Sequence, residues 1–403
     1  MAKNVARSGP IRPADRVRDI RYAVRDVVQL ATELEATGRE MFYLNIGDPN
    51  IFDFETPPHI RGAAARAIEN NMNGYGASDG VEEALVAIRA EAEGKGIRSV
   101  RHAWIGNGCS EVIDMALTAL ANRGENVLVP SPGYPLYSAL LTKLEVEARE
   151  YYLDEDAGWQ PDPDDIAARI DDKTRAIVVI NPNNPTGSLA SRETLERVIA
   201  LAEEHNLVVF ADEIYDRLIF DDAEHVPMGS ISETATIISL GGLSKNYVAP
   251  GWRIGWGVLS GVEENIADFR AGIQQLGRAR LSANHPEQFS IKPALEGDQS
   301  HIASMIERLT ERRDLMMEQI SSVDGISCVP PQGAFYAFPR LADGVDDARW
   351  ARDLMEETGV VVVHGSGFGQ KPGTSHFRIV LLPPPEILGE ACRRIAAFTN
   401  SNR

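Results

Sequence analysis

The sequence contains few cysteines and no long apolar segment. Its 403 residues include three cysteines, Cys109, Cys328 and Cys392, which lie far apart in the chain. This spacing suits neither a disulfide framework nor a zinc site and favours a reducing compartment. No apolar run approaches the roughly 18 residues that a transmembrane helix needs, and residues 1–19 lack the apolar region of a signal peptide. We therefore expect a cytoplasmic protein that has no membrane partner.

Positive charge is also scarce. Forty lysines and arginines face 59 acidic residues, for a formal net charge of −19. Because nucleic acids and anionic membranes attract positively charged surfaces, this balance argues against both as partners. Hydrophobic residues make up 43% and charged residues 25% of the chain, as in ordinary globular proteins. The length favours one large domain and a smaller one, with a cleft between them.

The middle of the chain alternates short apolar runs rich in β-branched residues with helical stretches. This pattern predicts an α/β domain with a mostly parallel central sheet. In such sheets ligands bind beyond the carboxyl ends of the strands, so residues that finish these runs are the first functional candidates. The predicted strands lie at residues 103–108, 126–132, 149–153, 176–182, 207–213, 236–242 and 253–259.

The C-terminal part has a different pattern, with long helical segments followed by short strands. It predicts a smaller α+β domain, with which a helix near residues 27–38 and the rest of the first fifty residues would pack. We therefore expect an arm and small-domain segment at 1–50, a large domain at 51–295 and a small C-terminal domain at 296–403. The helices are predicted at 287–297, 301–322 and 385–400, and the strands at 333–339, 359–365 and 376–382.

Two of the central strands end in polar residues. Asp212 closes an apolar run, and a carboxylate buried there needs a partner, either a helix cap or ion pair, or a cationic ligand. The run before it ends in "NPNNPTG", whose Asn181, Asn183 and Asn184 offer amides on a proline-stiffened loop. A plain turn is the alternative reading of this loop.

The segment "GNGCSE" precedes a helical pattern, so the amides of Gly108, Cys109 and Ser110 would form a helix N-terminus. Such an end binds anions, and the expected anion is a phosphate. The segment is not the GxGxxG fingerprint, which follows none of the predicted strands, and this disfavours an NAD-dependent dehydrogenase.

Lys245 follows the strand at 236–242, where burial would make its amine nucleophilic, although most lysines are surface charges. Arg253, in "GWRIGW", suits the recognition of a phosphate. Tyr134, in "SPGYPLY", follows another strand and offers a ring for stacking. These residues, with Asp212 and the helix start, meet at one sheet edge and together describe a site for one cofactor.

The sequence resembles the class I aminotransferases, which use pyridoxal 5′-phosphate (PLP) and have the PLP-dependent transferase fold type I. Within them it is most similar to the bacterial alanine aminotransferase (glutamate–pyruvate transaminase) subgroup. The resemblance covers the chain from about Ile20 to its end. It rests on the segments "LNIGDPN", "GYGASDG", "GNGCSE", "PGYPLY", "INPNNPTG", "FADEIYD", "GLSKNYVAPGWRIGW", "RLSANHPEQ", "PQGAFYAFP" and "HFRIVLLP", which occur in the family's order.

The resemblance implies a set of catalytic and cofactor-binding residues. Lys245 would hold PLP as a Schiff base and then act as the general base, while Asp212 would pair with the pyridine nitrogen. Catalysis would also involve Tyr215. The remaining roles are hydrogen bonds to the ring oxygen O3′ from Tyr215 and Asn184, ring stacking by Tyr134, phosphate binding by Arg253 and the amides of Cys109 and Ser110, cofactor binding by Ser244, and contact of Tyr75 with the phosphate of the other subunit of a homodimer.

The resemblance also implies how substrates bind. Arg378 would hold the substrate α-carboxylate in a bidentate pair, helped by Asn184 and the backbone of Gly47. The segment "IRYAVRD" resembles the lid of the alanine-type enzymes and would place Tyr22 over the substrate and Arg25 at the distal carboxylate of glutamate; for Arg25 an exposed helix charge is the alternative. The implied reaction is L-alanine + 2-oxoglutarate ⇌ pyruvate + L-glutamate by a ping-pong cycle.

Some features depart from the wider family. Many relatives carry Ser or Thr three residues before the lysine, where this chain has Gly242, and its "PGYP" is a mild change beside Tyr134. One aspartate-specific subgroup has a lysine at the position of Ser110, so its absence disfavours aspartate. The alternatives are another or broader specificity, including aspartate or valine, and a C–S β-lyase of the same fold. A PLP-sensing regulator would need a basic DNA-binding segment, for which the acidic chain has no room before Ile20.

Overall fold

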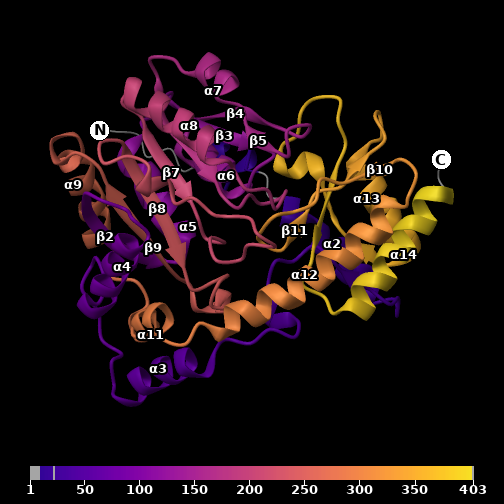
Figure 1. The fold of residues 1–403 in the computed structure, drawn as a ribbon, viewed down its shortest axis with the longest axis horizontal. Helices are drawn as coiled ribbons and strands as arrows, with labels where there is room; N and C mark the ends of the chain where they lie inside the picture. Colours follow the sequence, from indigo (N-terminus) through magenta and orange to yellow (C-terminus); the bar gives the residue numbers. More distant parts are fainter. Residues whose placement is uncertain (1–9, 21–22, 402–403) are drawn as a thin grey trace.

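The computed structural model describes residues 10–20 and 23–401, and of residues 23–26 only the backbone (Figure 1). Its centre is an eight-stranded sheet with the strand order β2-β9-β8-β7-β6-β3-β4-β5. From β8 to β4 all neighbours in this order are parallel, whereas β9 and β5 run antiparallel to their neighbours. The mostly parallel sheet is thus confirmed, and its reversed strands are β9 in the interior and β5 at the edge. The strands are β2 (Val100–Asn107), β3 (Asn126–Ser131), β4 (Glu147–Asp154), β5 (Gln160–Pro161), β6 (Thr174–Ile180), β7 (Val208–Asp212), β8 (Thr236–Gly242) and β9 (Ile254–Ser260).

Helices cover both faces of this sheet, because its central strands are apolar on both sides. On β6, Val178 packs in a cluster with residues of α5, α6 and α9, whereas the adjacent Val179 packs with residues of α7 and α8 on the other face. The sheet thus lies between two sets of helices, in the left-hand part of Figure 1. The helices of this part are α3 (Pro58–Glu69), α4 (Glu82–Gly94), α5 (Cys109–Leu120), α6 (Leu136–Leu144), α7 (Pro163–Arg169), α8 (Arg192–Glu204) and α9 (Glu263–Arg280).

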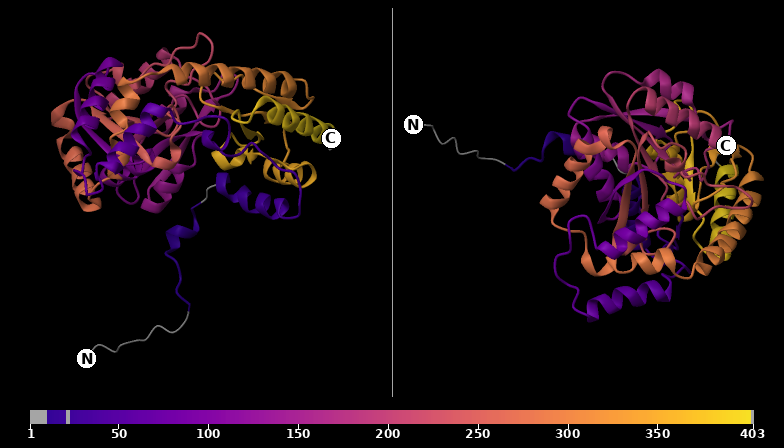
Figure 2. Two further views of the ribbon diagram at one scale, coloured as in Figure 1. Left: turned by 90° about the horizontal axis from the view of Figure 1, so that it is seen from below. Right: turned by 60° about the vertical axis from the view of Figure 1, so that its left-hand side comes forward.

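The C-terminal residues form short strands and long helices beside the large sheet. Strand β1 (Phe42–Tyr43) pairs in parallel with β13 (Val360–Val361), and β15 (Phe377–Val380) pairs antiparallel with both β11 (Tyr336–Ala337) and β14 (Val363–His364). Figure 2 shows α12 passing from the large sheet to the C-terminal helices. The remaining elements are β10 (Ile326–Ser327), β12 (Arg340–Leu341), α1 (Asp15–Arg18), α2 (Ala23–Glu35), α12 (Ser300–Ser321), α13 (Asp347–Thr358) and α14 (Pro385–Ser401).

The predicted continuous helix at 287–297 is wrong. The segment forms two short helices, α10 (His285–Gln288) and α11 (Ile291–Glu296). Pro293 explains the break, because a proline has no N–H and its ring clashes with the carbonyl four residues earlier. Beginning the second helix at Ile291 leaves Pro293 in the first turn, where no intrahelical N–H bond is lost.

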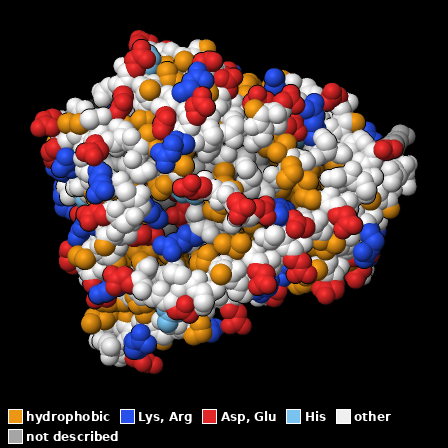
Figure 3. Space-filling model, in the orientation of Figure 1, with side chains coloured by type: hydrophobic (Ala, Val, Ile, Leu, Met, Phe, Trp, Pro, Cys, Tyr) orange, Lys and Arg blue, Asp and Glu red, His pale blue; other side chains and the backbone are white. Residues whose placement is uncertain are grey.

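The surface carries the excess of acidic residues in a dispersed form. On the face drawn in Figure 3, acidic side chains lie over both the large-sheet part and the C-terminal part and are interspersed with basic ones. Among the described residues, no helix is both long enough and apolar enough to cross a bilayer.

Candidate active site

A cavity of about 720 Å³ opens at the carboxyl ends of the parallel strands. Asp212 ends β7, Lys245 lies in the loop after β8, and Cys109 begins α5, so three separate elements deliver polar groups to it. The structure brings together here most of the site residues predicted from the sequence, namely Gly47, Cys109, Ser110, Tyr134, Asn184, Asp212, Tyr215, Ser244, Lys245, Arg253 and Arg378.

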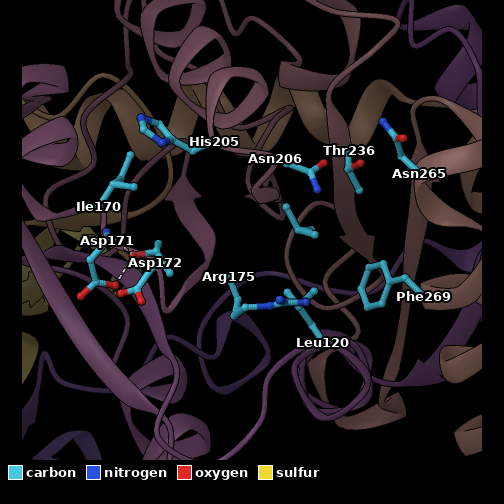
Figure 4. Close-up of a pocket in the computed structure, with 12 residues that line it drawn as sticks. Leu120, Ile170, Asp171, Asp172, Arg175, His205, Asn206, Thr236, Asn265 and Phe269 are labelled. Carbon is cyan, nitrogen blue, oxygen red and sulfur yellow. Dashed lines mark hydrogen bonds between the residues drawn. The ribbon is translucent and has the colours of Figure 1, made fainter.

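A second cavity, of about 580 Å³, lies at the opposite edge of the sheet (Figure 4). Its lining includes Thr174, Val208 and Thr236, the first residues of β6, β7 and β8, together with polar side chains such as His205 and Asn206. No predicted site residue that the structure describes lines this cavity. Because open α/β sheets bind ligands at the carboxyl ends of their strands, the first cavity is the candidate active site.

The lysine lies in the wall of the candidate cavity. Lys245 is partly buried, and its Nζ donates a hydrogen bond of 2.8 Å to the carbonyl oxygen of Gly47. The Nζ atom lies 5.4 Å from the ring centroid of Phe335 and 5.9 Å from that of Tyr215. The amine is therefore held at a defined place in aromatic surroundings and faces the cavity, as a nucleophile requires.

Asp212 presents a buried carboxylate that is only half satisfied. Its side chain is 4% exposed, and Oδ2 accepts a hydrogen bond of 3.1 Å from the hydroxyl of Tyr137. Oδ1 is buried and has no hydrogen-bond partner among the described residues. Burial raises the pKa of Asp212 to about 6. An anion in this state fits a cationic group of a ligand in the cavity.

The start of α5 forms an anion-binding corner with Arg253. Gly108, with φ of 80°, precedes the helix, and a side chain there would overlap the Arg253 guanidinium. A side chain at Gly255 would likewise overlap the Cys109 amide nitrogen. The glycines thus let β9 and the guanidinium approach the helix N-terminus, where amides and a positive charge suit a phosphate.

Arg378 supplies a buried cation from β15. The side chain is 2% exposed, with Nη1 donating to Asn184 Oδ1 at 3.1 Å and Nη2 donating to the Asn45 carbonyl at 2.6 Å. Its guanidinium carbon lies 4.6 Å from the ring centroids of both Tyr336 and Phe368. A fixed planar guanidinium that faces the cavity suits a carboxylate.

Some predicted residues lie elsewhere. Of the three asparagines of the "NPNNPTG" loop only Asn184 lines the cavity, because Asn181 Oδ1 accepts from the Ala190 amide at 3.0 Å and Asn183 donates to Thr186 Oγ1 at 2.9 Å. Tyr75 is 85% exposed and does not line the cavity of its own chain.

The segment predicted to form a lid contains Tyr22 and Arg25. Tyr22 lies outside the described residues, and Arg25 lies on α2 in the stretch where only the backbone is described. Val28, three residues after Arg25 on the same helix, lines the cavity. Helix α2 therefore borders the site, as a lid would.

The structure adds two phenols that the sequence did not single out. Tyr137, on α6, donates to Asp212, and the hydroxyl of Tyr336 lies 3.0 Å from that of Tyr215. Both tyrosines belong to segments that carry the family resemblance, "PGYPLY" and "PQGAFYAFP". Membership of these segments is the one feature of the sequence that could have pointed to them. The structure also explains Gly242, because a Cβ atom there would lie 2.9 Å from the Ile254 carbonyl oxygen.

Comparisons with known proteins give the family. Residues 39–395 match the family model "Aminotransferase class I and II". The chain is 40% identical to the glutamate-pyruvate aminotransferase AlaA of Haemophilus influenzae, with 97% of this chain and 98% of the relative covered, and 39% identical to an alanine aminotransferase of Mycobacterium tuberculosis, with 96% and 92% covered. The solved structure of an alanine aminotransferase from Pyrococcus furiosus superposes with a TM-score of 0.93 at 39% identity, covering 97% of this chain and all of that one.

The fold and the site thus define a PLP-dependent aminotransferase of fold type I. The chain belongs to the class I and II aminotransferases, and its cofactor is PLP. The residues present fit this group, because the unpartnered oxygen of Asp212 suits a protonated ring nitrogen, the start of α5 suits a phosphate and the amine of Lys245 suits an aldehyde.

Proposed function

We propose that the protein interconverts L-alanine + 2-oxoglutarate and pyruvate + L-glutamate. The observation that carries the proposal is that Lys245, the unpartnered oxygen of Asp212 and the buried guanidinium of Arg378 all line one cavity. The choice of substrates is supported by the relatives, which are named glutamate-pyruvate aminotransferase and alanine aminotransferase and match over nearly the whole chain.

Several groups would hold the cofactor at one end of the cavity. When bound, PLP supplies an aldehyde that links to amines and a ring that withdraws electrons from the substrate α-carbon. Lys245 would hold the cofactor covalently, and its amine, once released, would move the proton at the substrate α-carbon. Asp212 would keep the ring nitrogen protonated. The other contacts that we propose are a hydrogen bond to the ring oxygen from Tyr215 and Asn184, stacking by Tyr134, phosphate binding by Arg253 and the amides of Cys109 and Ser110, and a cofactor contact from Ser244.

The substrate end would select a small amino acid. Arg378 would bind the α-carboxylate through two parallel N–H donors, and Asn184 and Gly47 would complete this end. Val28, Ile46 and Ile51 also line the cavity, and their apolar side chains suit the methyl group of alanine. Tyr22 and Arg25 would contribute from the N-terminal lid, Arg25 at the distal carboxylate of glutamate.

We further propose that the active unit is a homodimer. Tyr75 and Leu281 are aromatic or apolar residues more than half exposed, and the Gly76 amide next to Tyr75 donates to the hydroxyl of Ser282 next to Leu281. Exposed apolar groups gathered in this way suit an interface, through which Tyr75 would reach the phosphate of the other subunit. Light scattering should give the mass of two chains, and a monomer that retains full activity would contradict the homodimer.

Two further assignments follow the sequence. A cytoplasmic location is supported by the three cysteines, which form no disulfide in the structure. The division into segments 1–50, 51–295 and 296–403 is supported by the pairing of β1 with β13, which ties the first segment to the last. Limited proteolysis tests this division, since cleavage should concentrate near residues 50 and 295.

A half-reaction survey tests the reaction itself. The PLP-loaded protein is mixed with single amino acids without any oxo acid, and the loss of visible absorbance is recorded. Alanine and glutamate should react fastest, with aspartate and valine slower by about tenfold or more. Failure of both alanine and glutamate would overturn the proposal. Release of pyruvate and sulfide from cysteine, without an oxo acid, would instead identify a C–S β-lyase.

A further inference from the structure

Tyr336 touches residues at both ends of the cavity, and the proposed function gives it no role. It lies on β11, which pairs with β15, the strand that carries Arg378. The side chain is 2% exposed and lines the cavity. The Arg378 guanidinium lies 4.6 Å from the centroid of its ring, and its hydroxyl lies 3.0 Å from that of Tyr215. One side chain thus contacts both the arginine expected to bind carboxylate and the phenol expected to bind the cofactor ring.

The two hydroxyls can share only one hydrogen between them. If Tyr336 donates, the hydrogen of Tyr215 is available to a ligand in the cavity; if Tyr215 donates, its hydrogen is used up. Burial, and after it the neighbouring Tyr336, raises the pKa of Tyr215 well above its usual value, so the phenol keeps its hydrogen.

The surroundings of Tyr336 favour one direction. A side chain at Gly47 would overlap the Tyr336 hydroxyl, so the backbone of Gly47 closes off this side of the oxygen. Among the described residues, Tyr215 is the only hydrogen-bond partner of the Tyr336 hydroxyl. Tyr215 itself faces the cavity, where a ligand oxygen would accept its hydrogen.

We propose that Tyr336 is a positioning residue that donates its hydrogen to Tyr215 and thereby directs the Tyr215 hydrogen to the ring oxygen of PLP. This rests on the proposed function, because it assumes that Tyr215 meets that oxygen. The ring and the hydroxyl of Tyr336 have separate tasks, since the ring supports Arg378 and the hydroxyl orients Tyr215.

A pH titration of the visible absorbance of the PLP-loaded protein tests this. A hydrogen bond donated to the ring oxygen stabilises the negative charge on that oxygen. The charge is most localised when the nitrogen that joins the lysine to the cofactor is unprotonated, so the hydrogen bond favours the unprotonated form. Weakening that bond therefore raises the midpoint of the titration. Tyr336→Phe should raise it by roughly half a pH unit, in the same direction as Tyr215→Phe but by less.

The double variant separates this role from a merely structural one. In the Tyr215→Phe background, Tyr336→Phe should add no further shift, because the orientation it controls no longer exists. The KM for alanine should change by less than about threefold in Tyr336→Phe, since the aromatic face beside Arg378 is retained. Tyr151→Phe is the matched control, because Tyr151 is a fully buried phenol bonded to the Val178 carbonyl outside this cavity, and its midpoint should equal that of the wild type.

A second variant reaches the same contact without removing a phenol. Gly47→Ala would displace the Tyr336 hydroxyl and should raise the midpoint in the wild type but not in Tyr215→Phe. This comparison separates the effect from the hydrogen bond that the Gly47 carbonyl accepts from Lys245, and it decides the matter if Tyr336→Phe does not fold. A wild-type midpoint in Tyr336→Phe, or shifts of Tyr336→Phe and Tyr215→Phe that simply add, would overturn the inference. A wild type that takes up no PLP would instead overturn the proposed function.

Discussion

Tyr137 and Asp212 form a buried hydrogen bond of 3.1 Å that joins α6 to the end of β7. The bond occupies one carboxylate oxygen, and the other has no partner among the described residues. Burial raises the pKa of Asp212 to about 6, against the opposing influence of the Tyr137 hydroxyl, the Ile214 amide and the charge on Lys245. One oxygen is thus fixed for orientation while the other remains available to the cofactor.

Removing the Tyr137 hydroxyl should weaken the binding of PLP. In Tyr137→Phe the Asp212 anion loses a donor, and a hydrogen bond to a charged group contributes roughly 1.5–3 kcal/mol. We expect the Kd for PLP, measured by fluorescence quenching of the apoprotein, to rise about tenfold or more. Tyr151→Phe serves as the control, and equal Kd values in Tyr137→Phe and the wild type would contradict this role.

Ionisation of the buried Asp212 carboxyl should destabilise the cofactor-free protein. The carboxyl titrates near 3.8 in the unfolded chain and near 6 when buried, so between these values the folded state binds the extra proton. Stability is therefore lost as the pH rises through this window and is constant above it. The full penalty is roughly 3 kcal/mol.

The variant Asp212→Asn isolates this effect, because it keeps the shape of the side chain but does not titrate. In urea unfolding of the apoprotein, its advantage over the wild type should grow by about 1 kcal/mol between pH 5 and pH 7 and then level off. With PLP bound, the wild type should instead be more stable than Asp212→Asn. An advantage that does not vary with pH would show that Asp212 is not the buried acid described above.

Sequence patterns were sufficient to place Asp212 and Lys245, because both follow apolar runs whose carboxyl ends share one sheet edge. The direction of β9 was not predictable, since a strand buried on both faces reads as apolar whichever way it runs. Nor was the contact of Tyr336 with Tyr215, which depends on the pairing of β11 with β15 and on how these strands pack against the large sheet. The contact of Tyr137 with Asp212 was also not predicted. It depends on which face of α6 points toward the ends of the strands, and packing against the sheet decides this.

Substitutions of Arg378 and Arg253 should affect different steps: the first should weaken the binding of substrate and the second the binding of cofactor. Arg378→Lys keeps the charge but loses the planar pair of donors, so KM for both alanine and glutamate should rise about tenfold or more while the Kd for PLP stays unchanged. Arg253→Lys is the matched comparison and should weaken PLP binding with little effect on the KM values. Loss of PLP in Arg378→Lys at unchanged KM would contradict the assignment of Arg378 to the substrate.

Arg25 should distinguish the two amino donors. In Arg25→Ala the distal carboxylate of glutamate and 2-oxoglutarate would lose its cationic partner, whereas alanine and pyruvate have no such group. Because exposed ion pairs contribute up to about 1 kcal/mol, KM should rise about fivefold for the first pair only. Steady-state kinetics with all four substrates measures this, and unchanged KM values for all four would favour the exposed helix charge that is the alternative for Arg25.

The central claim is that Lys245 carries the cofactor. Reduction of the PLP-loaded protein with borohydride makes the link permanent, and mass spectrometry of the digested protein then locates it. We predict the added cofactor mass on the peptide that contains Lys245, its absence in Lys245→Ala, and a loss of transaminase activity in that variant on the order of 10⁴-fold or more. Label on another lysine, or none on the wild type, would contradict the account.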